Sequence, residues 1–358
     1  MGAFGLDEMI ADLRRLVEAE SPSTDPEALR ACAEVVDDLC ERLLGTAPEH
    51  EGPHLVWRRP GDHDRPVLLL GHYDTVWPLG TLAGFPFEVA EGIARGPGVY
   101  DMKAGVVQAL HGLASTTAPA VLVLTADEEL GSPASRLLIE REAKAARAVL
   151  VLEPSGPGGA LKIARKGVAH WRMEIEGRAA HAGLEPERGV NALDELANQI
   201  KAIHALADSE AGTSVTVTRA GGGSAPNVVA ESAWCVVDAR MWTNAEGERL
   251  EREMEALPPI LPGAKVRVTG GVNRGPMERA AGEALYERLR GLGYDLPAIA
   301  VGGGSDGNFT ATLGIPTLDG LGAVGDGAHA RREHVVVDEM PRRAEMVARL
   351  LDDLAAGG

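Results

Sequence analysis

The chain has 358 residues, of which 45% are hydrophobic, 25% charged and only 4% aromatic. This length allows a large core and two domains, since compact units usually hold ~100–200 residues. The formal net charge of −18 disfavours nucleic acid and anionic membranes as partners, because such partners are bound through basic patches. No stretch approaches the ~20 uncharged apolar residues that a membrane span requires.

The start of the chain and its cysteines predict a cytoplasmic protein. The first residues, MGAFGLDEMIADLRRL, lack a basic segment followed by a long apolar stretch, so no signal peptide is expected. Cys32, Cys40 and Cys235 form no CxxC pair and are odd in number, which favours buried thiols in a reducing compartment.

The first 166 residues alternate between helical and strand patterns. Two amphipathic helices are predicted in the first forty-odd residues, the second within SPSTDPEALRACAEVVDDLCERLL, which has a Ser/Thr/Asp start and an early proline. Continuous apolar runs then predict strands that are buried on both faces, with helices between them. The strand segments are VLLLGH, AVLVLTADEE and AVLVLE, and the helical segments are MKAGVVQALHGLA and SPASRLLIEREAKA. This order predicts an α/β fold with a mostly parallel sheet and helices on both faces.

The pattern changes near Gly167, where VAHWRMEIEG alternates polar and apolar residues as in a sheet with one solvated face. A helix, two alternating strands, a charged helix and a last strand follow, and the order β-α-β-β-α-β matches the ferredoxin-like unit. We therefore expect a discontinuous domain of residues 1–166 and 275–358, interrupted by an inserted α+β domain of residues 167–274.

Histidines and acidic residues follow several predicted strands or lie in nearby loops. In open α/β sheets ligands bind at the carboxyl ends of the strands, so these side chains are expected to meet at one rim. Imidazole and carboxylate without cysteine suit Zn, Mn or Co. Each residue alone has an ordinary structural explanation as a turn, cap or scaffold residue, and only their coincidence predicts a metal site. The set comprises His72, Asp74, Asp101, Asp127, Glu128, Glu129, Glu153, Asp326, His329, Glu333 and His334.

Two glycine-rich segments suggest other functions less strongly. GPGVYDMKAG has Asp101 where a dinucleotide-binding loop needs its third glycine, so that fingerprint fails. VGGGSDGN contains a serine but does not match GxSxG, so a nucleophile elbow is not supported. The second segment could still offer backbone N–H groups to an anionic substrate group.

Eight segments together resemble the di-zinc family of glutamate carboxypeptidases, acetylornithine deacetylases, succinyl-diaminopimelate desuccinylases and aminoacylases. They run in the family's order from about residue 67 to 334, and the glutamate carboxypeptidase branch is the most similar. The segments are GHYDTV, GPGVYDMKAG, TADEELGS, LEPS, GRAAHAG, PNVVAESAWCVVDAR, GGGSDGN and GDGAH.

The resemblance implies two Zn²⁺ per subunit, with Co or Mn able to substitute. His72 and Glu153 would bind one zinc, Glu129 and His329 the other, and Asp101 would bridge the pair. Two cations ~3.5–4 Å apart need such a shared anion, and together they lower the pKa of a bridging water.

Two further carboxylates receive catalytic roles from the resemblance. Asp74 would orient the His72 imidazole from behind. Glu128 would be the general base that takes the proton of the bridging water and passes it to the leaving amine. Asp127, Asp326, Glu333 and His334 receive no assigned role.

The inserted domain would be the lid and dimerisation domain. His181 resembles the family histidine that reaches the partner subunit's active site and stabilises the oxyanion. Arg240 and Asn227 match positions that bind the substrate's carboxylate and carbonyl, a task for which a guanidinium is suited. Gly303 and Gly304 are expected to line the same pocket.

The resulting hypothesis is a cytoplasmic, homodimeric two-zinc amidohydrolase. It would release a C-terminal amino acid, glutamate-like, from a small peptide or N-acyl conjugate. One alternative is an N-acyl amino acid deacylase or desuccinylase with the same mechanism and another acyl group. A remote alternative is a catalytically silent metal-binding interaction protein, against which the presence of Glu128 beside a full ligand set argues.

Overall fold

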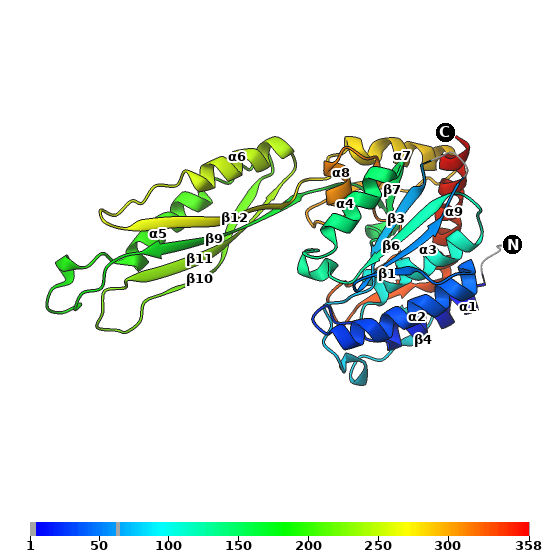
Figure 1. The fold of residues 1–358 in the computed structure, drawn as a ribbon, viewed down its shortest axis with the longest axis horizontal. Helices are drawn as coiled ribbons and strands as arrows, with labels where there is room; N and C mark the ends of the chain where they lie inside the picture. Colours follow the sequence, from blue (N-terminus) through cyan, green and yellow to red (C-terminus); the bar gives the residue numbers. More distant parts are fainter. Residues whose placement is uncertain (1–4, 62–64, 358) are drawn as a thin grey trace. The chain divides into compact units, whose positions relative to one another are not determined.

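A computed structural model describes residues 5–61 and 65–357 (Figure 1). The chain divides into two compact units. Of the described residues, 5–61, 65–164, 277–301 and 305–357 belong to unit 1, and 165–276 with 302–304 belong to unit 2. The sequence pattern predicts the boundaries at 166/167 and 274/275.

A six-stranded, mostly parallel sheet organises unit 1, with the strand order β1-β2-β6-β3-β7-β14. Strand β3 pairs in parallel with β6 and β7, and β14 pairs in parallel with β7. The antiparallel edge formed by β2 and β1 was not predicted from the sequence. The bounds are β1 Glu49–Glu51, β2 His54–Arg59, β3 Val67–His72, β6 Ala120–Thr125, β7 Ala148–Val151 and β14 Thr317–Leu318.

Helices cover both faces of this sheet, as the continuous apolar strands predict. Val67 and Leu69 of β3 join a core with helices α1, α2, α3 and α9, whereas Leu68 and Leu70 join a second core with α4 and α8. Because successive side chains of a strand point to opposite faces, one apolar strand anchors both layers. The helices are α1 Leu6–Glu18, α2 Pro26–Leu44, α3 Ala104–Ala114, α4 Arg136–Ala145, α7 Ala280–Gly291, α8 Gly307–Thr312 and α9 Met340–Ala356.

Helix α2 begins and ends at residues whose chemistry favours helix termini. The Asp25 side chain accepts the backbone N–H groups of Glu27 and Ala28, and Pro26 occupies the first helical position. Gly45 ends the helix at φ 85°, a left-handed conformation that glycine adopts without steric cost.

Two smaller sheets complete unit 1. One has the order β15-β16-β5-β4, and its β15–β16 hairpin presents residues 327–333 in the connecting loop. The other pairs β13 with β8. The bounds are β4 Glu88–Ala90, β5 Ile93–Arg95, β8 Leu161–Arg165, β13 Ala298–Val301, β15 Gly325–Asp326 and β16 His334–Val336.

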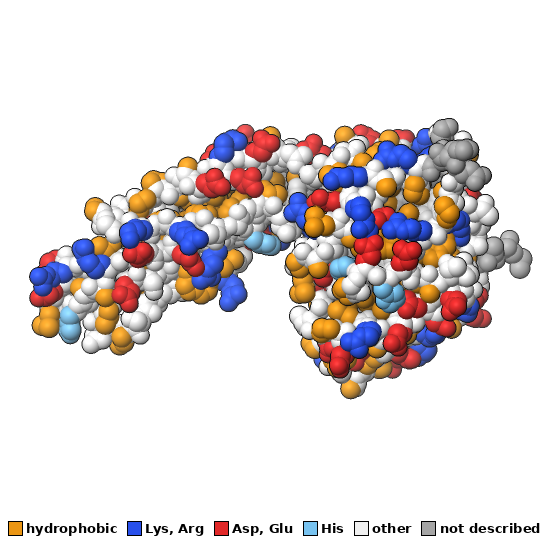
Figure 2. Space-filling model, in the orientation of Figure 1, with side chains coloured by type: hydrophobic (Ala, Val, Ile, Leu, Met, Phe, Trp, Pro, Cys, Tyr) orange, Lys and Arg blue, Asp and Glu red, His pale blue; other side chains and the backbone are white. Residues whose placement is uncertain are grey.

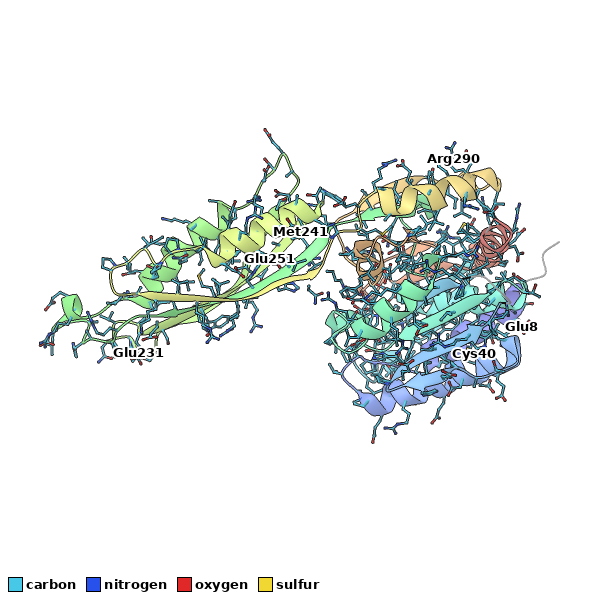
Figure 3. All side chains as sticks on the ribbon, turned by 45° about the horizontal axis from the view of Figure 1, so that its top comes forward. Glu8, Cys40, Glu231, Met241, Glu251 and Arg290 are labelled. Atoms are coloured by element: carbon cyan, nitrogen blue, oxygen red, sulfur yellow. The ribbon has the colours of Figure 1, made fainter. Side chains whose placement is uncertain are left out.

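Unit 2 is a four-stranded antiparallel sheet with the order β10-β11-β9-β12 and two helices, α5 and α6. Alternate residues of β9, including Trp171 and Met173, join α5 and α6 in a core of their own. Strand β11 runs the length of the sheet from the residue after Glu231 to Met241 (Figure 3). The bounds are β9 Gly167–Glu176, α5 Ala192–His204, β10 Ser214–Gly222, β11 Ser232–Met241, α6 Asn244–Glu255 and β12 Lys265–Arg274.

On the visible face of each unit, charged side chains of both signs are interspersed (Figure 2). Among the described residues, no helix combines the length and apolar character needed to cross a bilayer.

Candidate active site

His72, the last residue of β3, begins the site. Its side chain is buried, with Nε2 lying 3.3 Å from Asp101 Oδ1 and 3.6 Å from Glu153 Oε1. Glu153 follows β7, the strand beside β3. The Nε2 atom is buried yet forms no hydrogen bond with any described residue. A buried ring nitrogen that faces two carboxylates without a hydrogen bond fits a metal ligand.

Asp101 is shared with a second group. His329 Nε2 lies 3.4 Å from Asp101 Oδ2 and 3.1 Å from Glu129 Oε1. Each group, His72 with Asp101 and Glu153, or Asp101 with Glu129 and His329, has ligand atoms within 4.8 Å of one another. Two groups that share one carboxylate fit a pair of divalent cations, because the shared anion reduces their mutual repulsion. The five predicted ligands therefore come together as two overlapping triads.

The charges of these groups are strongly coupled. Burial alone would lower the pKa of His72, but the carboxylates of Asp101, Asp74 and Glu153 raise it well above its ordinary value. Asp101 and Glu129 raise the pKa of His329 to about 10. Burial raises the pKa of Glu129 despite its contact with His329. In this concentration of negative charge, cations are stabilised.

Asp74 connects the first triad to the TADEE segment. Its fully buried carboxylate lies 3.3 Å from His72 Nδ1 and accepts the Ser23 hydroxyl at 2.6 Å. The same carboxylate accepts the backbone N–H groups of Glu128 and Glu129, each at 3.3 Å. The His72 Nδ1 also lies 3.0 Å from the Asp74 backbone carbonyl, which accepts its hydrogen bond. Asp74 therefore contacts the imidazole through both backbone and side chain, and its carboxylate fixes the backbone of Glu128 and Glu129.

Glu333 fixes the backbone of the Asp101 loop. It is fully buried, and its carboxylate accepts the N–H groups of Gly98 at 3.0 Å, Tyr100 at 2.9 Å and Asp101 at 3.1 Å. The Trp77 indole donates a fourth hydrogen bond at 2.8 Å. In the sequence Glu333 lies four residues after His329, but neither the pattern nor the resemblance assigns it a role. The peptide bond that follows Asp101 is cis.

Asp326 and His334, which flank the same hairpin loop, have partners outside the two triads. Asp326 is exposed, 3.9 Å from the Arg332 guanidinium. His334 is hydrogen-bonded through Nδ1 to the Arg332 carbonyl at 3.0 Å. Neither joins the two triads.

Asp127, the third acid of the run, supports the loop. Its Oδ2 accepts the backbone N–H groups of Ala134 at 2.7 Å and Ser135 at 3.2 Å, just before α4. Asp306 of the GGGSDGN segment, whose role the sequence did not reveal, accepts the hydroxyls of Ser132 and Thr125. Both carboxylates thus hold the strand end from which Glu128 and Glu129 extend.

Within unit 2, His181 and Asn227 lie in neighbouring loops. His181 forms a bridge with Val228, the Ala182 N–H donates to the Asn227 carbonyl at 2.9 Å, and both His181 and Asn227 are exposed. His181 Nδ1 accepts the Gly183 N–H at 3.1 Å. An exposed imidazole on a loop is available to a substrate or a partner.

Arg240 and the two predicted glycines have partners of their own in unit 2. Asp238 accepts the Arg240 Nε at 3.0 Å and Nη2 at 2.8 Å. The Arg165 guanidinium donates to the carbonyls of Gly303 at 3.1 Å and Gly304 at 3.2 Å. The Asp238 carboxylate holds the Arg240 guanidinium in a defined orientation.

Comparisons with known proteins agree with this geometry. The model of "Peptidase family M20/M25/M40" matches residues 68–353. Carboxypeptidase G2 of Pseudomonas sp. (strain RS-16) is 33% identical over 377 residues, covering 98% of this chain and 90% of that protein. A succinyl-diaminopimelate desuccinylase of Dechloromonas aromatica is 27% identical over 369 residues, covering 90% of this chain and 96% of that protein. Aminopeptidase PepT from Bacillus cereus has the same fold, with a TM-score of 0.77 at 23% identity and coverage of 99% and 100% of the two chains.

The matched relatives and the two triads define a metal-dependent hydrolase. The match spans most of the chain, so the chain belongs to peptidase family M20/M25/M40. The catalytic-domain fold expected from the sequence is confirmed.

Proposed function

We propose that this protein is a two-zinc hydrolase that cleaves an amide bond and releases a C-terminal, glutamate-like amino acid from a small peptide or N-acyl conjugate. The observation that carries the proposal is the position of Asp101 in both ligand triads. Similarity to carboxypeptidase G2 over 98% of the chain supports the choice of reaction.

His72, Asp101 and Glu153 would hold one zinc, and Asp101, Glu129 and His329 the other. When bound, the ions supply Lewis-acid chemistry, which acidifies water and polarises the scissile carbonyl. Imidazole and carboxylate ligands also suit Co and Mn. Asp74 would keep His72 in one orientation through the contact at Nδ1.

Glu128 would be the general base. Its carboxylate would accept a proton from the attacking water and deliver it to the leaving nitrogen. Support comes from the Asp74 hydrogen bonds that hold the N–H groups of both Glu128 and Glu129. Glu128 and Glu129 lie in the 3₁₀ turn Glu128–Leu130, where successive side chains leave the backbone about 120° apart, so Glu129 can bind metal while Glu128 handles the proton.

Unit 2 would recognise the substrate and the partner subunit. Arg240 would bind the free α-carboxylate, Asn227 the carbonyl side, and Gly303 and Gly304 would line the pocket. His181 would act across a homodimer formed through residues 167–274 and stabilise the oxyanion. The orientation that Asp238 gives Arg240 supports its part in this scheme.

Desuccinylases among the relatives support a second candidate, an N-acyl amino acid deacylase with the same mechanism. The two candidates differ in the acyl group, on which Arg240 has no bearing. The three cysteines are buried and unpaired, which favours a reducing compartment, and we propose a cytoplasmic location.

A two-dimensional hydrolysis screen tests the proposal. N-acyl amino acids would vary the acyl group and the amino acid separately, with metal content measured alongside. Preference for an acidic C-terminal residue across many acyl groups is the expected result. Strict dependence on a succinyl or acetyl group, whatever the amino acid, would favour the deacylase. Full activity of metal-free protein would overturn both.

A further inference from the structure

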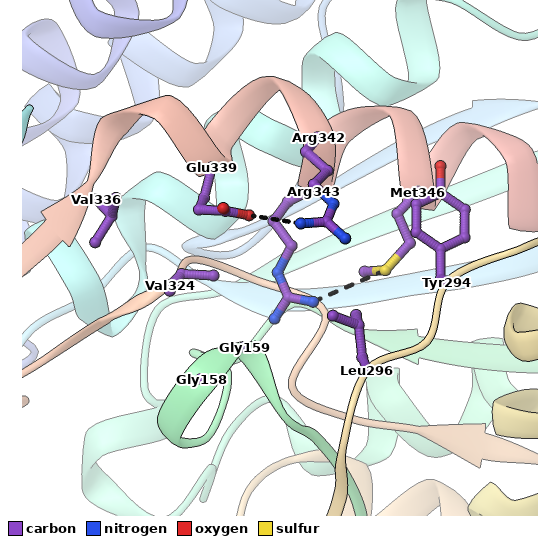
Figure 4. Close-up of a pocket in the computed structure, with 10 residues that line it drawn as sticks. All are labelled: Gly158, Gly159, Tyr294, Leu296, Val324, Val336, Glu339, Arg342, Arg343 and Met346. Carbon is purple, nitrogen blue, oxygen red and sulfur yellow. Dashed lines mark hydrogen bonds and ion pairs between the residues drawn. The ribbon is translucent and has the colours of Figure 1, made fainter.

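A cavity of about 310 Å³ lies in unit 1, and none of the five predicted metal ligands lines it (Figure 4). Its volume is at the lower end of the ~300–1,000 Å³ typical of small-ligand pockets. Helix α9, the segment after α7 and the loop before β8 contribute the walls. The lining residues are Gly158, Gly159, Tyr294, Leu296, Val324, Val336, Glu339, Arg342, Arg343 and Met346.

Arg343 projects from α9 into this space (Figure 4) and is 2% exposed. Its Nε donates to the Gly322 carbonyl at 3.0 Å, and Nη2 donates to the Gly320 carbonyl at 3.1 Å. The remaining contact, from Nη1, is 3.8 Å to the Met346 sulfur, a weak acceptor. A guanidinium has five N–H donors, so these three contacts leave it able to bind a further acceptor.

The positive charge of Arg343 lacks a counter-ion in the described part of the chain. No described carboxylate forms an ion pair with it, and Glu339 pairs instead with Arg342 at 3.7 Å. Burial consequently lowers the pKa of Arg343 to about 10. A buried charge without a partner destabilises the fold, and pairing with an opposite charge reduces this destabilisation. This guanidinium would therefore be stabilised by one bound negative charge.

The other walls determine what can carry that charge. Leu296, Val324, Val336 and Met346 are apolar, and the buried Tyr294 hydroxyl has no hydrogen-bond partner among the described residues. Apolar walls around a single buried cation suit a monoanion attached to an apolar body better than a highly charged phosphate. A carboxylate also matches the planar fork of a guanidinium.

We propose that this cavity is a binding site for a small organic carboxylate with an apolar body. The carboxylate meets the free N–H groups of Arg343, and the body occupies the space between Leu296 and Val324. Arg342, an exposed residue of the lining, neutralises the Glu339 carboxylate at 3.7 Å, so that Glu339 does not repel the anion. The site is separate from the one that we assign to hydrolysis, and it does not depend on that assignment.

Removing Arg343 itself would be a poor test. Its Nε holds the Gly322 carbonyl, while the Gly322 N–H donates to the Glu153 carbonyl at 2.9 Å. Replacing Arg343 would thus also disturb a predicted metal ligand. Leu296 is half-buried and Arg342 is exposed, so Leu296→Phe, which fills the cavity, and Arg342→Gln, which removes a charge, leave the interior intact.

Calorimetric titration of the zinc-loaded protein with hexanoate, and with hexanol as the uncharged analogue, tests the site. Hexanoate should bind saturably and hexanol at least tenfold more weakly. Leu296→Phe should weaken hexanoate binding at least tenfold and Arg342→Gln severalfold. Arg279→Gln, an exposed arginine of unit 1 paired with Glu283, is the matched control and should bind as wild type.

Three results would overturn the proposal: no saturable binding of hexanoate, equal binding of hexanol, or binding that Leu296→Phe and Arg342→Gln leave unchanged. The last result would place hexanoate elsewhere, for example at the metals. Circular dichroism would verify that each variant is folded, and if Leu296→Phe is not, then Arg342→Gln and the hexanol comparison decide.

Discussion

Glu333 accepts the backbone N–H of Asp101 at 3.1 Å across 232 positions of the chain. The carboxylate is fully buried and receives four N–H donors in total. It follows His329 by four residues, so it ties the loop that carries one predicted ligand to the loop that carries the shared one. Because Asp101 belongs to both triads, we expect both to depend on this attachment.

Glu333→Gln should therefore weaken metal binding. In glutamine an NH₂ group replaces one carboxylate oxygen and faces N–H donors that need an acceptor. Each buried donor left without an acceptor lowers the free energy of unfolding by about 1–3 kcal/mol. We expect lower zinc content after dialysis and a lower free energy of unfolding in urea. Glu345→Gln, an exposed position of α9, is the matched control. Wild-type zinc content and stability in Glu333→Gln would show that the attachment is dispensable.

Glu128→Gln should lower turnover by about 10²–10⁴-fold, the usual contribution of a general base, while zinc content stays unchanged. Glutamine keeps the size of the side chain but cannot accept the proton. The measurement is kcat on the best substrate of the hydrolysis screen, with metal analysis of the same sample. Glu88→Gln, on the exposed strand β4, should behave as wild type. Near-normal kcat would remove Glu128 as the base.

Removal of metal should abolish activity and also destabilise the fold. Without cations, the carboxylates of Asp101, Glu129 and Glu153 remain crowded around two imidazoles, and ligands that bind only the folded state stabilise it by mass action. Chelation should lower Tm, and added Zn²⁺ or Co²⁺ should restore both Tm and activity. An unchanged Tm together with undiminished activity after complete chelation would contradict the metal assignment.

Complementation tests the role of His181. If His181 acts in the partner's active site, mixing inactive His181→Ala chains with inactive Glu128→Gln chains should restore part of the activity. A mixed dimer then contains one site with both residues intact. Arg178→Ala, an exposed residue of the same segment, should keep its activity alone. Mixed dimers that form but remain inactive would count against action across the dimer.

Asp12 should make stability depend on pH. Burial would raise its pKa, but hydrogen bonds from His111 and Arg42 bring the pKa below its ordinary value. A carboxyl group with a lowered folded pKa stabilises the protein above its unfolded pKa of about 3.9 and loses that contribution as pH falls through the folded value. Asp12→Asn should lower the free energy of unfolding at pH 7 by about 1–3 kcal/mol, and the difference should narrow below pH ~4.

Urea unfolding of chelated protein at several pH values measures this effect without interference from metal binding. Asp7→Asn, an exposed position of the same helix, serves as the control. A difference between wild type and Asp12→Asn that is constant from pH 7 to pH 3 would disprove the linkage.

The parts of the fold that were predicted correctly are those marked by patterns within a short stretch of sequence. The run at residues 67–72 became β3 within its expected bounds, because an apolar strand buried on both faces carries its own pattern. The Asp25 cap and the Gly45 terminus delimit α2 for similar reasons. The antiparallel β2 edge was missed, since the burial pattern of residues 54–59 arises from pairing with β6, which is distant in the sequence.

The candidate ligands were also readable from the sequence, because each follows a strand or lies in a loop and carries a metal-binding side chain. Each of these residues alone has an ordinary structural explanation. Their coincidence at strand ends and in loops predicts a metal site, and the family resemblance selects His72, Asp101, Glu129, Glu153 and His329 as the ligands. The sequence alone therefore determined the class of fold and predicted a metal site of imidazole and carboxylate groups, and the two-zinc hypothesis came from the family resemblance.

Only the tertiary structure decided how those side chains are held. The attachment of Glu333 to Asp101, the support of the TADEE loop by Asp127 and the unpaired charge of Arg343 all depend on contacts between distant segments. A buried acid and a solvated acid have the same letter in a sequence, and they differ only in the donors and the burial that folding gives them. That physical difference separates Glu333, which organises the site, from Asp326, which lies in solvent nearby.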